Sequence, residues 1–270
     1  MTKKELIRAL NINGITKGSK VLLHSSFKAV AFEGTPEDVC YAFMETIGDE
    51  GLLVMPAHSL NFRNHPEVKG PYDSKSSRSR VGAISDAFWK IPGVFRSMHP
   101  THSDAAWGKG AEYLVNGHEK ADTVGVGSPL EKFSRTDGKI FMMGCRLSSC
   151  TMGHVAEWVA EVPYKTKHFA PEWGFEADYI DIDGQLKTYV FKTTPGCGGG
   201  FVNAKSWLAD AGVLREISLN KEVSYIFSAS EYIKILLEKL KEDPFALSSK
   251  DEVHLAKCNC CKTVNKMKNK

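Results

Sequence analysis

The sequence alternates short apolar runs with amphipathic segments, and this alternation limits the fold more than any other feature. Residues 3–10 place apolar side chains at helical spacing, and the apolar run 21–23 follows them. A second helix is predicted over residues 36–47, capped by Thr35, and a second apolar run covers residues 51–56. Helices and strands in turn predict a largely parallel sheet with helices packed on it.

The rest of the chain continues this pattern. The further predicted elements are helices over 82–89 and 230–241, a buried strand over 139–144, and a hairpin with strands 177–182 and 185–191. An Asp-Gly turn joins the hairpin strands, which indicates antiparallel pairing in the C-terminal half. We therefore predict a single α/β domain over residues 1–270, with a mixed, largely parallel sheet flanked by helices and a tail over residues 246–270.

Composition narrows the class of protein. The chain is 42% hydrophobic and 25% charged, as in ordinary folded proteins. No apolar stretch approaches the roughly 18 residues of a membrane helix, and no signal-peptide core follows Met1, so we expect a cytoplasmic protein without a membrane partner. A net charge of +3 with dispersed basic residues argues against binding to nucleic acid. The seven cysteines are expected to be reduced thiols.

Residues 150–157, just after a predicted buried strand, hold the pair best suited to proton transfer. On a helix capped by Thr151 or by a serine before it, His154 and Glu157 are three positions apart and face the same side. The carboxylate could hold one ring nitrogen and leave the other free to accept a proton. A surface pair would have the same spacing, but α/β proteins place ligands where a helix starts after a buried strand.

Two other segments combine histidine with hydroxyl groups. The His-Ser-Ser of residues 24–26 follows a predicted strand, where hydroxyls and backbone N–H groups suit the phosphate or amide groups of a ligand. Residues 96–108 contain two histidines, hydroxyls and small side chains, which indicates a binding loop. Alternatively, His99, His102 and Asp104 could ligate the metal of a hydrolase, although no second cluster with settled ligand spacing lies nearby in sequence.

Residues 57–80 form a polar segment that is long for a connection within a compact domain. We expect it to be a lid on the substrate side, or otherwise an ordinary solvated loop. Its basic residues outnumber its acidic ones, as Arg63, Lys69, Lys75, Arg78 and Arg80 stand against Glu67 and Asp73.

Cysteine and histidine gather near the C-terminus. The tail contains His254, Cys258, Cys260 and Cys261, which could in principle bind zinc. The Cys-x-Cys-Cys spacing is tighter than the usual paired-cysteine pattern, so we expect no metal. Cys197 lies in a glycine-rich segment without an evident base partner, and we expect a buried or spectator thiol there rather than a nucleophile.

Several segments together resemble the aminoglycoside 3-N-acetyltransferase family. They are residues 21–26, 51–56, 96–103 with 105–108, 127–130 and 151–157. The family's order and spacing are matched from about Lys3 to Phe245. The resemblance implies transfer of an acetyl group from acetyl-CoA to an amine, on an α/β fold unrelated to the GCN5-type acetyltransferases. It also implies that His154 is the general base and Glu157 its partner.

The resemblance and the side-chain chemistry together suggest further site residues. Hydroxyls near the acetyl group could stabilise an oxyanion, with Thr151 and Ser26 as candidates. The candidate coenzyme-binding residues are His24, Ser25, Ser26, Phe27, Lys28, Ser97, His99, Pro100, Thr101, His102 and Ser103, with Arg96 as a further candidate for the phosphates. The acidic candidates for contact with the acceptor are Asp73, Glu172 and Asp178.

The acceptor is expected to be an amine of an aminoglycoside-like molecule or of another small amine. Aminoglycosides are polycations and need converging carboxylates, whereas residues 57–80 are net basic, so the acceptor need not be an antibiotic. The alternative function is a catalytically weak protein of the same fold that binds coenzyme A or an antibiotic.

Overall fold

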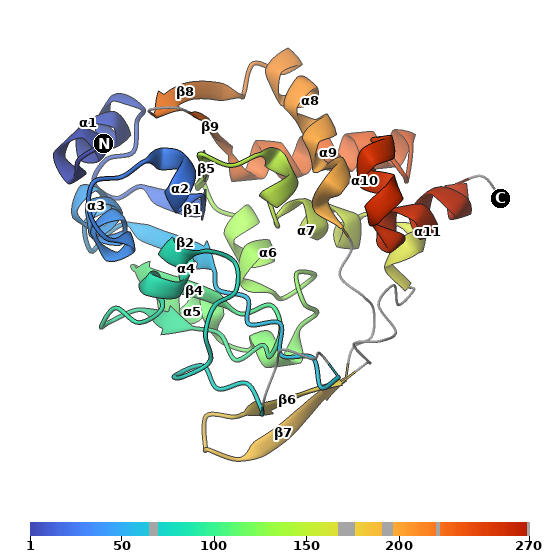
Figure 1. The fold of residues 1–270 in the computed structure, drawn as a ribbon, viewed down its shortest axis with the longest axis horizontal. Helices are drawn as coiled ribbons and strands as arrows, with labels where there is room; N and C mark the ends of the chain where they lie inside the picture. Colours follow the sequence, from blue (N-terminus) through green and yellow to red (C-terminus); the bar gives the residue numbers. More distant parts are fainter. Residues whose placement is uncertain (65–69, 167–175, 191–196, 220–221, 269–270) are drawn as a thin grey trace.

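In the computed structural model of the protein, the predicted apolar strands form the centre of a seven-stranded sheet of order β3-β4-β2-β1-β5-β9-β8 (Figure 1). The strands are β1 (Lys20–Ser25), β2 (Leu52–Pro56), β3 (Phe95–Arg96), β4 (Asp104–Gly108), β5 (Lys139–Met143), β8 (Arg215–Leu219) and β9 (Glu222–Ser228). The structure describes residues 1–64, 70–166, 176–190, 197–219 and 222–268.

The sheet is mixed, as predicted, but its parallel part is smaller than predicted. Strand β1 pairs in parallel with β2 and with β5, and the pairings of β2 with β4, β3 with β4, β5 with β9 and β8 with β9 are antiparallel. Parallel neighbours need a crossover of a dozen or more residues, and the connections from β3 to β4 and from β8 to β9 are too short for one. Parallel pairing is therefore confined to the central strands, where long helical connections exist.

The central strands are buried on both faces, which explains their consecutive apolar residues. In β1, Val21 and Leu23 pack on one face while Leu22 packs on the other. The first face is covered by α1 (Lys3–Ile12), α3 (Pro36–Ile47) and α4 (Ala83–Phe88). The second is covered by α5 (Ala111–Val115), α6 (Pro129–Ser134), α7 (Gly153–Val159), α8 (Ala204–Asp210) and α9 (Ala229–Glu242). These two apolar layers hold the sheet in place.

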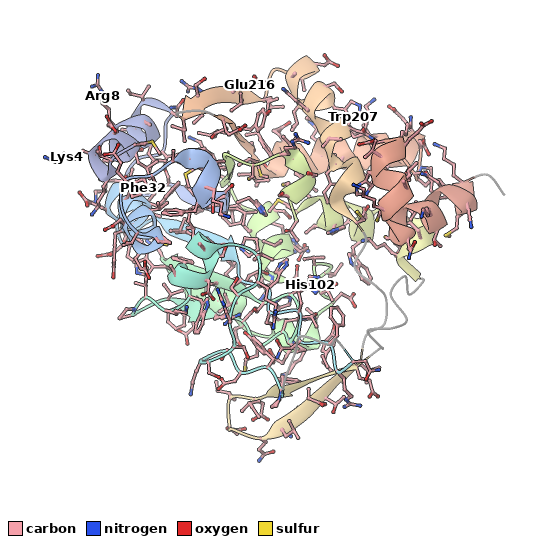
Figure 2. All side chains as sticks on the ribbon, viewed as in Figure 1. Lys4, Arg8, Phe32, His102, Trp207 and Glu216 are labelled. Carbon is pink, nitrogen blue, oxygen red and sulfur yellow. The ribbon has the colours of Figure 1, made fainter. Side chains whose placement is uncertain are left out.

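Most predicted helices are confirmed. Helix α1 buries Leu6 and Leu10, whereas Lys4 and Arg8 point outward (Figure 2). Thr35 caps α3 by accepting a hydrogen bond from the backbone of Asp38. The short helices are α2 (Phe27–Val30), α10 (Glu252–Lys257) and α11 (Asn259–Lys268), with 3₁₀ turns η1 (His118–Lys120), η2 (Leu147–Ser149), η3 (Pro163–Thr166) and η5 (Gly198–Asn203). No helix of the described residues is long and apolar enough to cross a bilayer.

The predicted side-chain cap of the helix that carries His154 is wrong. Helix α7 begins at Gly153 after Met152, and no side chain caps it. The serines proposed as caps lie in the 3₁₀ turn η2 instead, and the chain turns once more before α7 starts. Thr151 is thereby left with its hydroxyl outside the helix.

The predicted hairpin is confirmed as β6 (Glu176–Ile180) and β7 (Leu186–Val190), which form a separate two-stranded sheet (Figure 1). The described part of segment 57–80 is bonded to this hairpin. Backbone hydrogen bonds join Tyr72 to Asp178 and to Ile180, each at 2.7 Å. Arg63 forms ion pairs with Asp178 and with the neighbouring Glu176. This segment is therefore anchored at several points in the structure, and its role as a lid stays a prediction.

A glycine at the end of β4 provides a test of how tightly the sheet is packed. Gly108 has φ +96°, and a Cβ there would overlap the carbonyl of Gly51. We expect Gly108→Ala to lower the free energy of unfolding by about 2–4 kcal/mol, from a strained backbone and overpacking. Urea denaturation measures this. The control Gly110→Ala has a similar φ of +83° but open space around it, so only about 1–2 kcal/mol is expected. Equal losses in the two variants would contradict the packing argument.

Candidate active site

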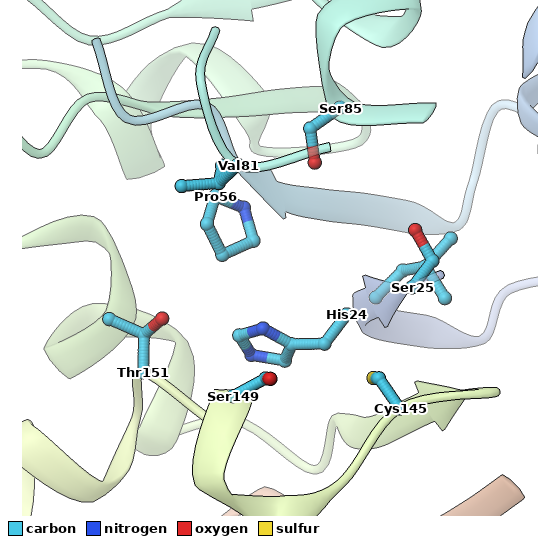
Figure 3. A pocket seen from close by; sticks show the side chains of 9 residues that line it. His24, Ser25, Pro56, Val81, Ser85, Cys145, Ser149 and Thr151 are labelled. Atoms are coloured by element: carbon cyan, nitrogen blue, oxygen red, sulfur yellow. The ribbon is translucent and has the colours of Figure 1, made fainter. Parts of the chain in front are cut away.

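A cavity of about 270 Å³ opens where the three parallel strands end (Figure 3). It is lined by Leu23, His24 and Ser25 from β1, Pro56 from β2, Val81 and Ser85 at α4, and Cys145, Ser149 and Thr151 after β5. Carboxyl ends of parallel strands meet at one edge of a sheet, which is the usual ligand position in α/β proteins. The strand ends singled out by the sequence are thus brought together.

His24 projects into this cavity between Pro56 and Ser149 (Figure 3). Its Nε2 is buried and has no hydrogen-bond partner among the described protein groups. Burial lowers the pKa of His24 to about 4, so the ring is neutral near pH 7. A neutral ring with one open nitrogen can donate to or accept from a polar ligand group in the cavity.

His154 and Glu157 form the pair expected from their spacing. The Nδ1 atom of His154 lies 2.7 Å from Oε2 of Glu157, and both side chains are buried. The same carboxylate accepts hydrogen bonds from the ammonium of Lys165 at 2.6 Å and from the hydroxyl of Tyr164 at 2.9 Å. Three donors therefore surround one carboxylate.

The charges around Glu157 determine the tautomer of His154. Burial alone would raise the pKa of Glu157, but the charge of Lys165 and the hydrogen bonds outweigh burial and lower the pKa to about 2. An ionised carboxylate can only accept hydrogen bonds, so Nδ1 of His154 carries the proton. Nε2 is then the nitrogen with a free lone pair.

His154 is neutral in this setting. Burial lowers its pKa, and the ammonium of Lys165, 3.3 Å from Nδ1, lowers it further against the opposing effect of Glu157. The ring packs edge-on against Phe201, with centroids 4.7 Å apart. The backbone N–H of His154 donates to the carbonyl of Thr151, whose side chain lines the cavity. Nε2 of His154 can therefore accept a proton, and His154 lies one helical turn along the chain from Thr151 in the cavity wall.

The loop predicted to bind a ligand is bonded to itself in the structure. Ser97, His99, Thr101, His102 and Ser103 are buried, and none of them lines the cavity at His24. Nδ1 of His99 accepts from the backbone of Thr101 and of His102, at 3.2 and 3.1 Å. Figure 2 shows His102 among the loops between the sheet and the hairpin in that view. Its contact with coenzyme stays a prediction.

The alternative metal site in this loop does not form. Within the described residues, His99, His102 and Asp104 are not brought together as a group that could hold an ion. The Nδ1 of His102 instead contacts the hydroxyl of Thr101 at 2.8 Å. Burial raises the pKa of Asp104 well above its ordinary value, which disfavours the ionised form that a metal ligand needs.

Arg96 and Lys28, the two cations suggested for coenzyme phosphates, lie in different settings. The guanidinium of Arg96 bonds to the carbonyls of Ala57 and Ser77 and stacks on Trp89, 4.6 Å from the ring centroid. It therefore supports segment 57–80. Lys28 is exposed on α2, beside the half-buried Ser26 and Phe27, and remains available to a ligand.

Asp73 and Asp178, the two predicted acceptor-binding acids that the structure describes, do not line the cavity. Asp73 lines a second groove of about 840 Å³ together with Trp89, Lys90 and Arg96. Asp178 is paired with Arg63, at 2.6 Å, which neutralises much of its charge. Glu172 lies outside the described residues. None of the three is assigned a role by the geometry alone.

Sequence reasoning missed Lys165, Tyr164 and His118. The chain reverses after α7 at Glu161, where φ is +50°, and this turn returns Tyr164 and Lys165 to Glu157. No periodic pattern marks such a return. His118 is a buried structural residue that bonds Ser97 and the carbonyl of Thr123, each at 2.9 Å.

Comparisons with known proteins agree on one family. The profile of that family, described as aminoglycoside 3-N-acetyltransferase, matches residues 22–241. The curated aminoglycoside N(3)-acetyltransferase IV of Salmonella sp is 28% identical over 262 residues, which is 96% of this chain and 94% of the relative.

Solved structures share the fold. A mutant of aminoglycoside acetyltransferase AAC(3)-IVa in complex with a gentamicin has a TM-score of 0.82 at 26% identity, covering 98% of this chain and 96% of that one. A binary complex of AAC-IIIb with CoASH has a TM-score of 0.78 at 23% identity, covering 90% and 97%, which shows the fold. The expected difference from the GCN5-type fold is confirmed.

The charge of Lys165 can be tested through the titration of His154. We expect Lys165→Met to raise the pKa of His154, because the variant removes a nearby positive charge. NMR titration of the imidazole would show protonation beginning at higher pH than in the unmodified protein. Lys165→Arg is the control, since it keeps the charge and should keep the lower pKa. An unchanged titration in Lys165→Met would contradict this account.

Proposed function

The chain belongs to the aminoglycoside 3-N-acetyltransferase family and is an acyltransferase, and on that premise we propose that it transfers acetyl from acetyl-CoA to an amine with His154 as general base. The observation that carries the proposal is the buried 2.7 Å contact between Nδ1 of His154 and Glu157. It leaves Nε2 as the proton acceptor, one turn from a cavity at the strand ends.

The proposed reaction needs no covalent enzyme intermediate. The amine nitrogen attacks the thioester carbonyl carbon, and His154 Nε2 takes the proton that the nitrogen loses. The tetrahedral intermediate then collapses, the C–S bond breaks, and the leaving thiolate receives the proton from His154. The products are the N-acetylated amine and coenzyme A. The base is recovered in its neutral form.

Glu157 supports this cycle electrostatically. When His154 takes the proton, its ring becomes a cation beside a carboxylate that is already ionised. That carboxylate also holds Nδ1 in one orientation, so Nε2 does not need to be positioned anew in each cycle. Lys165 acts in the opposite direction, because its charge lowers the pKa of His154 and keeps the free ring unprotonated.

The cavity suits the acetyl-bearing end of the coenzyme. The side chains of Thr151 and His24 both line it, and the hydroxyl of Thr151 can donate to an oxygen that becomes negative during attack. We assign the oxyanion contact to Thr151, because it directly precedes the helix of the base. Ser25, with Ser26, Phe27 and exposed Lys28 beyond it, would follow the coenzyme outward from the cavity.

For the acceptor, the family favours an aminoglycoside, and a smaller amine is the competing substrate. The mutant of AAC(3)-IVa that this chain resembles was solved with a gentamicin. Arg63 of segment 57–80 is paired with Asp178 and Glu176, so its positive charge is less able to repel a polycationic acceptor. Asp73 is the acidic side chain of segment 57–80 that remains on an open groove.

The proposed role of His154 as general base can be tested by removing its imidazole ring. We expect His154→Ala to lower kcat by roughly 10²–10⁴-fold, since general base catalysis contributes about that much. Acetyl-CoA turnover is followed by thiol release, and coenzyme affinity by calorimetry should be unchanged. Added imidazole should restore part of the rate. An unchanged rate would favour the alternative of a binding protein without catalysis.

The acceptor can be identified with a panel of aminoglycosides and monoamines. If the acceptor is a polycation that reaches Asp73, Asp73→Asn should raise KM for gentamicin by about 2–5-fold, as expected for one exposed charge pair, and leave KM for a monoamine unchanged. Asp49→Asn is the control, because Asp49 is exposed and precedes β2, at the opposite end of that strand from the cavity. Turnover of monoamines alone would exclude aminoglycosides as substrates.

A further inference from the structure

Four sulfur and nitrogen ligands converge beside the C-terminal helices. They come from Cys197, His254, Cys258 and Cys261, and the four ligand atoms all lie within 4.8 Å of one another. Nε2 of His254 is 3.2 Å from the sulfur of Cys197 and 3.4 Å from that of Cys261. We infer that these side chains bind one Zn²⁺ ion that joins the C-terminal tail to the turn at Cys197.

The spacing of these ligands in the tail is typical of a zinc site. Cys258 and Cys261 are separated by two residues, which is a common zinc spacing, and His254 lies one helical turn before Cys258. The four-residue set expected from the tail alone included Cys260. In the structure Cys260 instead lines a small void, and Cys197, 57 positions from His254, supplies the fourth ligand. The tight Cys-x-Cys-Cys spacing that argues against metal includes Cys260, which is not one of the four converging residues.

The geometry fits a four-coordinate ion. Zinc bonds of about 2.3 Å to sulfur and 2.0–2.1 Å to nitrogen, in a tetrahedron, put the ligand atoms about 3.5–3.8 Å apart. The two contacts of His254 are slightly shorter than this, and the widest separation among the four ligand atoms is up to 4.8 Å. Binding therefore requires the close pairs to move apart and the most distant ligands to move together by about 1 Å. Three cysteines and one histidine fill all four positions. A site closed in this way is structural, because it has no open position for substrate.

The backbone around the cluster is shaped to hold these ligands. The N–H of Gly199 donates to the sulfur of Cys197 at 3.4 Å, and a Cβ at Gly199 would overlap the ring of His254. Only glycine leaves room there for the imidazole. Cys258 ends α10 and donates its N–H to the carbonyl of His254 at 2.9 Å. The ligands therefore come from two separate parts of the chain, the turn at Cys197 and the C-terminal tail.

Few side chains of the C-terminal helices are buried, and α11 is held in addition by hydrogen bonds of Asn265 with Ser248 and Ser249 and by an ion pair of Lys268 with Asp243. Helix α10 buries no residue, and α11 buries only Cys261 and Val264. Isolated helices of six and ten residues are marginal in water, so helices this short need tertiary contacts. A zinc ion bonded to both helices and to Cys197 would supply a further attachment.

The site also adjoins the candidate catalytic pair. Cys197 precedes η5, whose Phe201 packs on the ring of His154. Cys197 and Cys261 line a small void together with Glu157 and Tyr164. Zinc would thus hold in place the residues that pack against His154 and Glu157, without contacting substrate. The inference does not depend on the proposed function, because metal content can be measured without any activity.

Elemental analysis of the full-length protein tests the inference. After purification without chelator and dialysis, we expect about one zinc per chain. Each of C197S, C258S and C261S should reduce zinc by tenfold or more. C260S is the matched control, since this neighbouring cysteine lies outside the cluster and should keep the full metal content. Loss of zinc in C260S, or its retention in C197S, would overturn the assignment of ligands.

A second measurement covers the case in which the ligand variants fail to fold. Unmodified protein is stripped of metal under reducing conditions and loaded with Co²⁺, whose visible spectrum distinguishes tetrahedral thiolate ligation from octahedral binding. We expect intense tetrahedral bands together with sulfur-to-metal charge transfer. Absence of zinc from the purified protein, with no thiolate-bound Co²⁺ on reloading, would overturn the site. A Cys197–Cys261 disulfide found by mass spectrometry in place of metal would do the same.

Discussion

The buried carboxylate of Glu157 is the group on which the active site depends. A charge taken out of water must be compensated by several donors, and the ring of His154, Lys165 and Tyr164 supply them. The last two reach the carboxylate because the chain reverses at Glu161 after α7. The need to compensate this buried charge therefore determines both the tautomer of His154 and the path of the backbone after α7. The same contact holds the ring of His154 in one orientation.

The cavity depends on a different constraint, the two-sided burial of the parallel strands. Because β1, β2 and β5 are covered by apolar layers on both faces, polar side chains gather at the strand ends. His24 and Thr151 meet there, although 127 positions separate them in the sequence. Behind them, the loop 97–103 is bonded to itself and holds the ends of β2 and β4 together. Packing thus forms the cavity, and the proposed chemistry depends on the pair of His154 and Glu157.

The C-terminal tail lies beside Glu157 and Tyr164. Its helices bury few apolar side chains, and its sulfur and nitrogen ligands converge on the turn that leads to Phe201. Phe201 packs on His154, so the turn at Cys197 connects the tail with this ring. The family profile ends at residue 241, before this tail begins. The match to AAC(3)-IVa covers 98% of this chain, so it extends into the tail although the profile does not.

The sequence by itself determined the alternating elements, the hairpin and the cooperation of His154 with Glu157, because periodicity and short spacing are local properties. It overestimated the parallel share of the sheet and chose Cys260 rather than Cys197 as a neighbour of His254. Only the tertiary structure decided those pairings and the return of Lys165 to Glu157. The physical reason is that strand order and long-range contacts depend on which apolar surfaces pack against each other. A turn at a single residue can change the direction of the chain and so change these contacts.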